Sequence, residues 1–320
     1  MERLKRTEKN TLTERVLQFG EGNFLRGFVD WMIDKLNKEN GGDYGVTIVQ
    51  PLAGGLVDKL NAQDGRYSLY LRGLLKGEKV EETRIVDCVT RGINPYTNTD
   101  EFFECAKNPD LRFIVSNTTE AGIEYKPNQN PDDFNGLTFP GRLTLFMKKR
   151  FDEGLGGFIL LPCELIDKNG DNLKECILKY SVDWGYGDEF EKWIETENHF
   201  TNTLVDRIVT GYPRDNAKEM EQSYGYLDDM IDTAEIFHLW VIEGDKKLAE
   251  EIPFHKIGLN VLWTDDVTPY KKRKVRILNG AHTMTVLAAH LAGLETVKDA
   301  MDDELVFSFM KQGIFEEIIP

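Results

Sequence analysis

The chain has 320 residues, of which 41% are hydrophobic and 11% aromatic, enough for a sizeable core and for two domains. Its 39 basic and 55 acidic residues give a net charge of −16, which argues against a nucleic-acid partner, since phosphate backbones require basic patches. No run approaches the roughly 18–20 apolar residues that cross a bilayer, and the four scattered cysteines fit neither a zinc cage nor a disulfide framework. We therefore expect a cytoplasmic protein with no membrane partner.

The first part of the sequence predicts a βαβ unit followed by an antiparallel excursion. Residues 15–19 form a strand-like run, a glycine turn follows, and residues 24–36 have the apolar spacing of a helix. A second strand-like run, 46–49, ends at Gln50. Two β-rich runs come next, with a polar turn between them; they are residues 67–72 and 84–90, and the turn is 76–79.

The rest of the sequence predicts two further strands and then mostly helices. The predicted elements are a helix over 97–106, a strand over 111–116, a helix over 141–151, a strand over 158–161 and helices over 173–182, 190–198 and 274–291. Residues 235–242 are the one later β-like run. We expect an α/β chain with a Rossmann-like dinucleotide-binding domain over 1–250, including a β excursion near 66–90. The start of a mainly α-helical domain follows over 251–320.

The glycine turn between the first strand and helix is the candidate cofactor site. Gly20 permits the tight turn, and Gly22 lets a pyrophosphate approach the main chain at the helix N-terminus. The third glycine of G-x-G-x-x-G falls on Leu25, and the nearest small residue is Gly27, so the motif alone is weak. A plain turn is the competing interpretation. The candidate cofactor-binding residues are Phe19, Gly20, Gly22, Asn23, Phe24, Gln50, Ser116, Asn117 and Thr118.

The end of the second strand bears on the choice between NAD and NADP. Gln50 takes the place of the usual acidic residue, and its amide can bond a ribose hydroxyl without repelling a 2′-phosphate. The next basic residue along the chain is Lys59, so no cation stands beside Gln50 to bind a 2′-phosphate, and the sequence favours NAD over NADP. Residues 116–118 follow the strand over 111–116 and are expected to line the ligand crevice. The alternative is an ordinary loop in which Asn117 or Thr118 caps a short helix.

The helix over 274–291 carries the candidate catalytic group. At about 100° per residue, Lys274, His282 and Asn279 fall near ~0°, ~80° and ~140°, on one side of the helix. A lysine with a lowered pKa serves as general acid/base, an amide donates to a forming oxyanion, and a neutral histidine orients a hydroxyl. The alternative is a solvated basic helix start. However, five bases lie within residues 271–276, where the helix dipole disfavours cations, and an anionic substrate would explain them.

Other constellations are weaker. Asn202 offers a second amide donor, whereas Asp206 and Arg207 fit a structural ion pair or cap. The five histidines lie far apart, and no H-E-x-x-H or G-x-S-x-G motif is present, so we expect neither metal nor serine-type chemistry. The cysteines are interpreted as small buried hydrophobes.

Taken together, these motifs resemble the polyol-specific long-chain dehydrogenase/reductase family, also called the mannitol dehydrogenase family. The resemblance rests on residues 20–27, on Asn202-Thr203-Leu204-Val205-Asp206-Arg207-Ile208, and on Lys274 with Asn279 and His282. Residues 17–26, 115–123, 161–166 and 208–214 and the run 274–279 are most similar to the branch that interconverts tagaturonate and altronate. Fructuronate reduction and mannitol oxidation are the alternatives within the family.

The resemblance implies NAD as cofactor, no metal and a small sugar-acid substrate. It implies Lys274 as acid/base, Asn202 and Asn279 as the oxyanion donors, and His282 as the residue that orients the substrate. Two departures from mannitol-type relatives remove negative charge, namely Lys271 in place of an acidic residue and Glu243-Gly244 in place of a Glu-Asp pair. Relatives continue with further helices, so the resemblance also predicts a truncated chain, and an inactive NAD-binding fragment is the alternative of another class.

Overall fold

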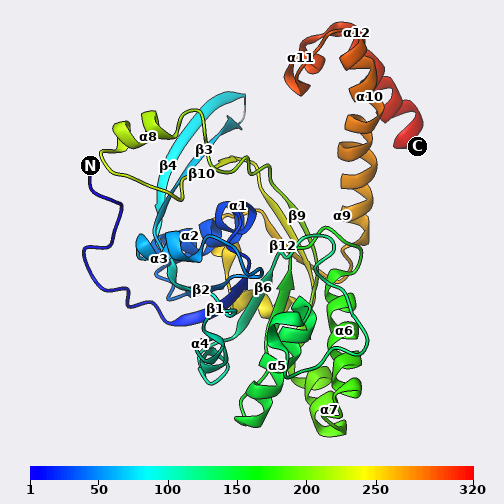
Figure 1. Ribbon diagram of the computed structural model, residues 1–320. Coiled ribbons are helices and arrows are strands. Elements are labelled where there is room, and N and C mark those ends of the chain that lie inside the picture. Colours follow the sequence, from blue (N-terminus) through cyan, green and yellow to red (C-terminus); the bar gives the residue numbers. More distant parts are fainter. Residues whose placement is uncertain (76) are drawn as a thin grey trace. The chain divides into compact units, whose positions relative to one another are not determined.

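The computed structural model describes residues 1–75 and 77–320 and divides into two compact units, Met1–Asp265 and Asp266–Pro320. The first unit contains all the described strands, and the second is helical (Figure 1). None of the described helices is long and apolar enough to cross a membrane.

The first unit is built on a six-stranded parallel sheet with the order β5-β2-β1-β6-β7-β8. The strands are β1 (Glu14–Phe19), β2 (Gly45–Val49), β5 (Val89–Ile93), β6 (Phe113–Ser116), β7 (Ile159–Pro162) and β8 (His199–Phe200). Counted within this sheet, the order is 3-2-1-4-5-6, which is the Rossmann arrangement. The order reverses between β1 and β6, and the carboxyl ends of these two strands therefore mark the expected ligand crevice. The predicted fold class is confirmed.

Both faces of this sheet are covered, because successive residues of β1 point to opposite sides. Val16 packs in one apolar cluster with Phe28 and Met32, whereas Leu17 packs in another with Phe146 and Ile177. The helices of the first unit are α1 (Asn23–Leu25), α2 (Trp31–Asn40), α3 (Val57–Ala62), α4 (Thr99–Cys105), α5 (Phe139–Asp152), α6 (Asn169–Asp183), α7 (Asp188–Glu197) and α8 (Ala217–Tyr224). A π-helical turn, Arg26–Asp30, joins α1 to α2. Neighbouring helices α5, α6 and α7 lie side by side (Figure 1).

Two smaller sheets complete the first unit. The predicted excursion is confirmed as an antiparallel hairpin of β3 (Tyr67–Leu75) and β4 (Glu78–Val86), with β10 (Asp232–Glu235) parallel to β3 (Figure 1). Part of the predicted turn, Lys76, lies outside the described residues. The third sheet has β11 (Leu239–Glu243) between β12 (Val261–Thr264) and β9 (Asn202–Asp206).

Two sequence-based expectations about strands were wrong, and three strands were missed. The β-rich run 84–90 is split, because β4 ends at Val86 in the small sheet and β5 begins at Val89 in the main sheet. Likewise, the run 235–242 is shared between β10 and β11. Strands β8, β9 and β12 were missed, since strands of two to five residues carry little periodic signal and form through pairing with distant segments.

The second unit consists of α9 (Thr268–Arg273), α10 (Gly280–Leu291), α11 (Val297–Asp302) and α12 (Glu304–Gln312), with π-helical turns at Lys274–Asn279 and Gly313–Ile318. A capping box formed by Thr296 and Asp299 starts α11. An apolar cavity of about 650 Å³ lies among α10, α11 and α12. Large apolar side chains of this unit remain exposed, and Leu291 is 87% exposed. The helices of the second unit thus present much apolar surface of their own.

Candidate dinucleotide site and catalytic helix

The glycine turn lies where β1, β2 and β6 end. The N–H of Gly20 donates to the Val49 carbonyl at 3.1 Å, and the N–H of Asn117 donates to the Phe19 carbonyl at 3.1 Å. Gly20 has φ of +127°, and a Cβ added there would lie 3.2 Å from the Asn117 carbonyl oxygen. Glycine at this position is therefore required both by the backbone conformation and by the close approach of β6.

Gly22 has a different role in the turn. Its backbone is extended, with φ of −64° and ψ of 164°, and a Cβ added there would meet nothing within 4 Å. Gly22 also precedes α1, and in the described structure no side chain caps the start of this helix. The turn therefore offers an open stretch of main chain and helix N–H groups on one side, which is the arrangement that receives a pyrophosphate.

The next glycine after the turn is Gly27, which lies in the π-helical turn, two residues beyond the position of the motif's third glycine. A Cβ added to Gly27 would lie 3.0 Å from Val209 Cγ1 and 3.3 Å from Asp232 Oδ2. Gly27, rather than the residue at position 25, thus permits the close packing that the motif assigns to its third glycine. Leu25 instead packs in the core.

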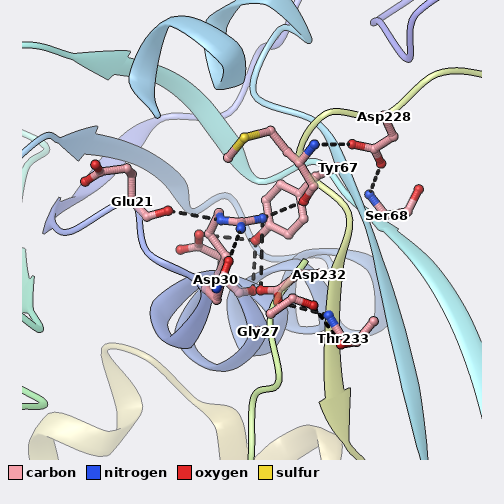
Figure 2. A network of polar contacts seen from close by, with 12 residues as sticks. Glu21, Gly27, Asp30, Tyr67, Ser68, Asp228, Asp232 and Thr233 are labelled. Carbon is pink, nitrogen blue, oxygen red and sulfur yellow. Dashed lines mark hydrogen bonds and ion pairs between the residues drawn. The ribbon is translucent and has the colours of Figure 1, made fainter. Parts of the chain in front are cut away.

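A buried guanidinium fixes the shape of the turn. Arg26 is 1% exposed and donates to the Glu21 carbonyl at 3.0 Å, to Asn23 Oδ1 at 2.7 Å and to the Met230 carbonyl at 2.6 Å (Figure 2). Its guanidinium carbon also lies 5.0 Å from the centre of the Tyr67 ring. Arg26 thereby connects the turn to the segment before β10, more than two hundred residues away in sequence.

Two carboxyl groups share the surroundings of this guanidinium. Asp30 Oδ2 accepts from the Tyr67 hydroxyl at 3.2 Å, and Asp232 Oδ2 lies 4.0 Å from Arg26 Nη1 (Figure 2). Burial raises the pKa of Asp30 to about 7 and that of Asp232 to about 6. Sequence reasoning missed this cluster. The available signal was two charged residues, Arg26 and Asp30, within an otherwise apolar stretch of helix.

Gln50 lies at the end of β2, as predicted, but its side chain is committed to its own loop. Its amide nitrogen donates to the carbonyls of Leu52 at 2.8 Å and Ala53 at 3.1 Å. Its amide oxygen accepts from the N–H of Val57 at 3.4 Å, and the residue is buried. Gln50 therefore shapes the loop of residues 51–56.

The predicted polar loop after β6 is held by a carboxylate that sequence reasoning missed. Glu164, which follows β7, is buried and accepts from Ser116 Oγ at 3.0 Å. It also accepts from the N–H and the hydroxyl of Thr118, both at 2.9 Å, while Asn117 donates to the Cys163 carbonyl at 2.8 Å. No helix begins at Asn117 or Thr118. Side chains of residues 116–118 thus fix the loop at the switch point, in a position set by the neighbouring strand.

Asn202 lies at the start of β9, opposite Glu243 of β11. Its amide nitrogen donates to Glu243 Oε1 at 2.9 Å, and its amide oxygen accepts from the N–H of Asp171 at 3.1 Å. Because an amide nitrogen carries two hydrogens, one donor remains after the bond to Glu243. Arg207, for which a structural role was predicted, donates to the carbonyls of Glu235 and Gly27, both at 2.8 Å.

In the second unit, the candidate catalytic helix departs from the regular geometry that the sequence-based angles assume. Lys274 and Asn279 bound the π-helical turn, in which hydrogen bonds join residues five apart. The angle around the helix axis between these two side chains is therefore smaller than the ~140° that a regular α-helix gives. Lys274 is half-buried, whereas Asn279 and His282 are exposed.

The remaining predicted features concern metals and thiols. Within residues 1–75 and 77–320, no three or more His, Cys, Asp or Glu side chains gather in a way that could hold a metal ion. All four cysteines are buried, as predicted, and each is a free thiol in this structure. Burial raises the pKa of the Cys88 and Cys163 thiols, which disfavours the reactive thiolate.

Comparison with known proteins agrees with this architecture. The family model "Mannitol dehydrogenase Rossmann domain" matches residues 14–256, and "Mannitol dehydrogenase C-terminal domain" matches residues 266–320. Altronate oxidoreductases of Shigella flexneri and Cronobacter sakazakii are each 49% identical over 312 residues, which is 96% of this chain. The chain spans 65% of the length of these relatives.

Solved structures show the same fold. A D-sorbitol dehydrogenase superimposes with a TM-score of 0.83 at 25% identity, covering 97% of this chain and 66% of its own. Mannitol 2-dehydrogenase of Pseudomonas fluorescens, in a ternary complex with NAD and D-mannitol, gives 0.78 at 21% identity, with 97% and 65% covered. From the sheet order, the glycine turn and the two family models together, the chain belongs to the mannitol dehydrogenase family.

Proposed function

We propose that this chain provides the cofactor-binding unit and the catalytic helix of an NAD-dependent oxidoreductase that interconverts tagaturonate and altronate. The observation that carries the proposal is the 49% identity with altronate oxidoreductases over 96% of the chain. The family membership supports the reaction class, and the name of these relatives supports the sugar acid.

The residues of the first unit fit a dinucleotide. Gly20 makes the turn at the switch point of the sheet, and Gly22 leaves the main chain open where a pyrophosphate would lie. The loop after β6, which Glu164 holds, borders the same end of β1. When bound, NAD accepts or supplies the hydride of the reaction.

The proposed chemistry assigns proton transfer to Lys274. Reduction of the keto carbon leaves negative charge on its oxygen, and the Lys274 ammonium gives this oxygen a proton. In the oxidation direction, the neutral amine removes the hydroxyl proton. The family resemblance assigns the role of oxyanion donor to Asn279 of the catalytic helix and to Asn202 of the first unit, and the orientation of the substrate to His282. Asn202 retains a donor for this purpose beside its bond to Glu243.

Local charge supports a sugar acid over a neutral polyol. Five basic residues lie within positions 271–276 of a chain whose net charge is −16. Lysine at position 271 adds to this local positive charge. A carboxylate on the substrate would be attracted to this segment, whereas a neutral polyol would gain nothing from it.

The test compares substrates on the purified 320-residue chain. NADH oxidation is measured with tagaturonate, fructuronate and fructose, beside NADH binding without substrate. Tagaturonate should turn over fastest. Faster turnover of fructose than of either uronate would overturn the sugar-acid assignment, and faster fructuronate turnover would favour fructuronate reduction.

A second candidate function is NAD binding without turnover. It is favoured by the second unit, whose helices line an apolar cavity and leave large apolar side chains exposed. NADH binding with no turnover of any of the three substrates would support it.

A further inference from the structure

The ribose-binding acid of the Rossmann fold is missing from its usual place. An aspartate or glutamate at the end of the second strand normally accepts hydrogen bonds from the adenosine ribose of NAD. Here Gln50 stands at that position, and both ends of its amide are bonded to the loop of residues 51–56 and to Val57. The nearest following acid is Asp58, which is exposed on α3. Another group must therefore discriminate NAD from NADP.

Glu21 brings a carboxylate to the same place from the glycine turn. Its Oε1 accepts from the N–H of Leu56 at 3.3 Å. A Cβ added to Gly55 would overlap both Glu21 Oε1 and the side-chain amide of Gln50. The two side chains, one from the end of β1 and one from the end of β2, thus meet at a single residue of the loop.

The Glu21 carboxylate is buried and incompletely bonded. The residue is 7% exposed, and among the described residues no donor bonds its Oε2. Figure 2 shows the main-chain oxygen of Glu21 facing the buried cluster, with its carboxylate pointing the other way. A buried oxygen of this kind is costly unless a ligand supplies a donor. The exposed Gly54 and Gly55 allow the covering loop to adjust when a ligand enters.

We propose that Glu21 binds the adenosine ribose of NAD through Oε2 and excludes the 2′-phosphate of NADP. A ribose hydroxyl would donate to this oxygen, giving a charge-assisted hydrogen bond. A 2′-phosphate would instead place negative charge beside a buried carboxylate. This inference rests on the proposed function, because it takes the glycine turn to be the dinucleotide site.

The experiment uses ligands that carry only the adenosine half of the cofactor. Binding of ADP-ribose and of 2′-phospho-ADP-ribose to the 320-residue chain is measured by isothermal titration calorimetry. Wild type should prefer ADP-ribose. Glu21→Gln should weaken ADP-ribose by about tenfold or more, since a hydrogen bond to a charged group is lost. The same variant should also have a smaller ratio between the dissociation constants of 2′-phospho-ADP-ribose and ADP-ribose than wild type has. Asp58→Asn, which removes a nearby exposed charge, should change both constants by no more than about twofold.

Each outcome decides between distinct claims. Wild-type protein that binds neither ligand would overturn the proposed cofactor together with this inference. If wild type binds ADP-ribose and Glu21→Gln keeps the wild-type preference for ADP-ribose over 2′-phospho-ADP-ribose, only the role of Glu21 is overturned. If circular dichroism shows that Glu21→Gln is unfolded, Glu21→Asp decides. The Glu21→Asp variant should bind ADP-ribose more weakly than wild type does, and it should still bind 2′-phospho-ADP-ribose more weakly than ADP-ribose. If this variant binds both ligands as tightly as wild type does, the inference is refuted.

Discussion

The guanidinium of Arg26 lies 4.0 Å from the carboxylate of Asp232, and both side chains are shielded from solvent. One belongs to the helix that follows the glycine turn, and the other begins β10. Arg26 also donates to the Met230 carbonyl, so the two segments are joined at two points. The glycine turn is therefore held in place by Asp232 of β10, a strand of a different sheet, and by the segment before it.

Replacing Arg26 should destabilise the first unit strongly. Arg26→Met removes three hydrogen bonds and takes the Arg26 cation away from the buried Asp232, which costs about 3–5 kcal/mol. The free energy of unfolding in urea measures the loss. Arg3→Met, which breaks an exposed ion pair with Asp229, is the matched control and should cost less than about 1 kcal/mol. Similar losses in both variants would contradict the role given to Arg26.

The buried carboxyl of Asp30 should make stability depend on pH. Its pKa is raised from 3.8 to about 7 in the folded chain, chiefly by burial. The folded state thus holds the proton more tightly than the unfolded state does. The resulting stabilisation is fully present below the ordinary pKa and is lost as pH rises through about 7, at roughly 1.4 kcal/mol per pKa unit.

Asp30→Asn should flatten this dependence, because the amide does not titrate. Urea unfolding between about pH 4 and about pH 8 would show a smaller decline in the variant than in wild type. Exposed Asp215 provides a control, since Asp215→Asn should retain the wild-type decline. An Asp30→Asn curve parallel to that of wild type would remove Asp30 as the source.

Substitutions at the two glycines of the turn should have different effects, one on stability and the other on NADH binding. Gly20→Ala forces a side chain into a backbone with φ of +127° and should cost about 1–3 kcal/mol of stability. Gly22→Ala meets open space and should fold as wild type, yet bind NADH at least about tenfold more weakly, because its methyl group occupies the pyrophosphate approach. Urea unfolding and NADH fluorescence titration measure the two effects. Undiminished NADH binding by Gly22→Ala would place the cofactor elsewhere.

Replacement of Lys274, the proposed acid/base, should strongly reduce the turnover rate and leave the affinity for the cofactor unchanged. Lys274→Ala should lose about 10²–10⁴ in turnover of tagaturonate, with NADH affinity unchanged. Lys311→Ala removes an exposed lysine of α12, outside the basic segment of residues 271–276, and should retain most of the turnover. Near-normal turnover by Lys274→Ala would exclude Lys274 from the mechanism.

The local features of the turn could be predicted because they depend on neighbouring residues alone. The apolar run before Gly20, the glycines themselves and the helical spacing after Asn23 specify strand, turn and helix in order. The close-packing glycine was harder to identify. Gly27 takes this role because Val209 and Asp232 pack against it, and both are distant in sequence.

The sequence by itself determined the βαβ opening, the glycine turn, the polar loop after β6 and the basic helix, since each depends on residues that are neighbours in the sequence. Only the tertiary structure decided which strands share a sheet, and it alone surrounded Arg26 with Asp30, Tyr67 and Asp232. The physical reason is that burial is a property of the folded chain. A carboxyl such as that of Asp30 or Glu21 has an ordinary pKa in an extended chain, and its pKa is raised when distant segments exclude water from it.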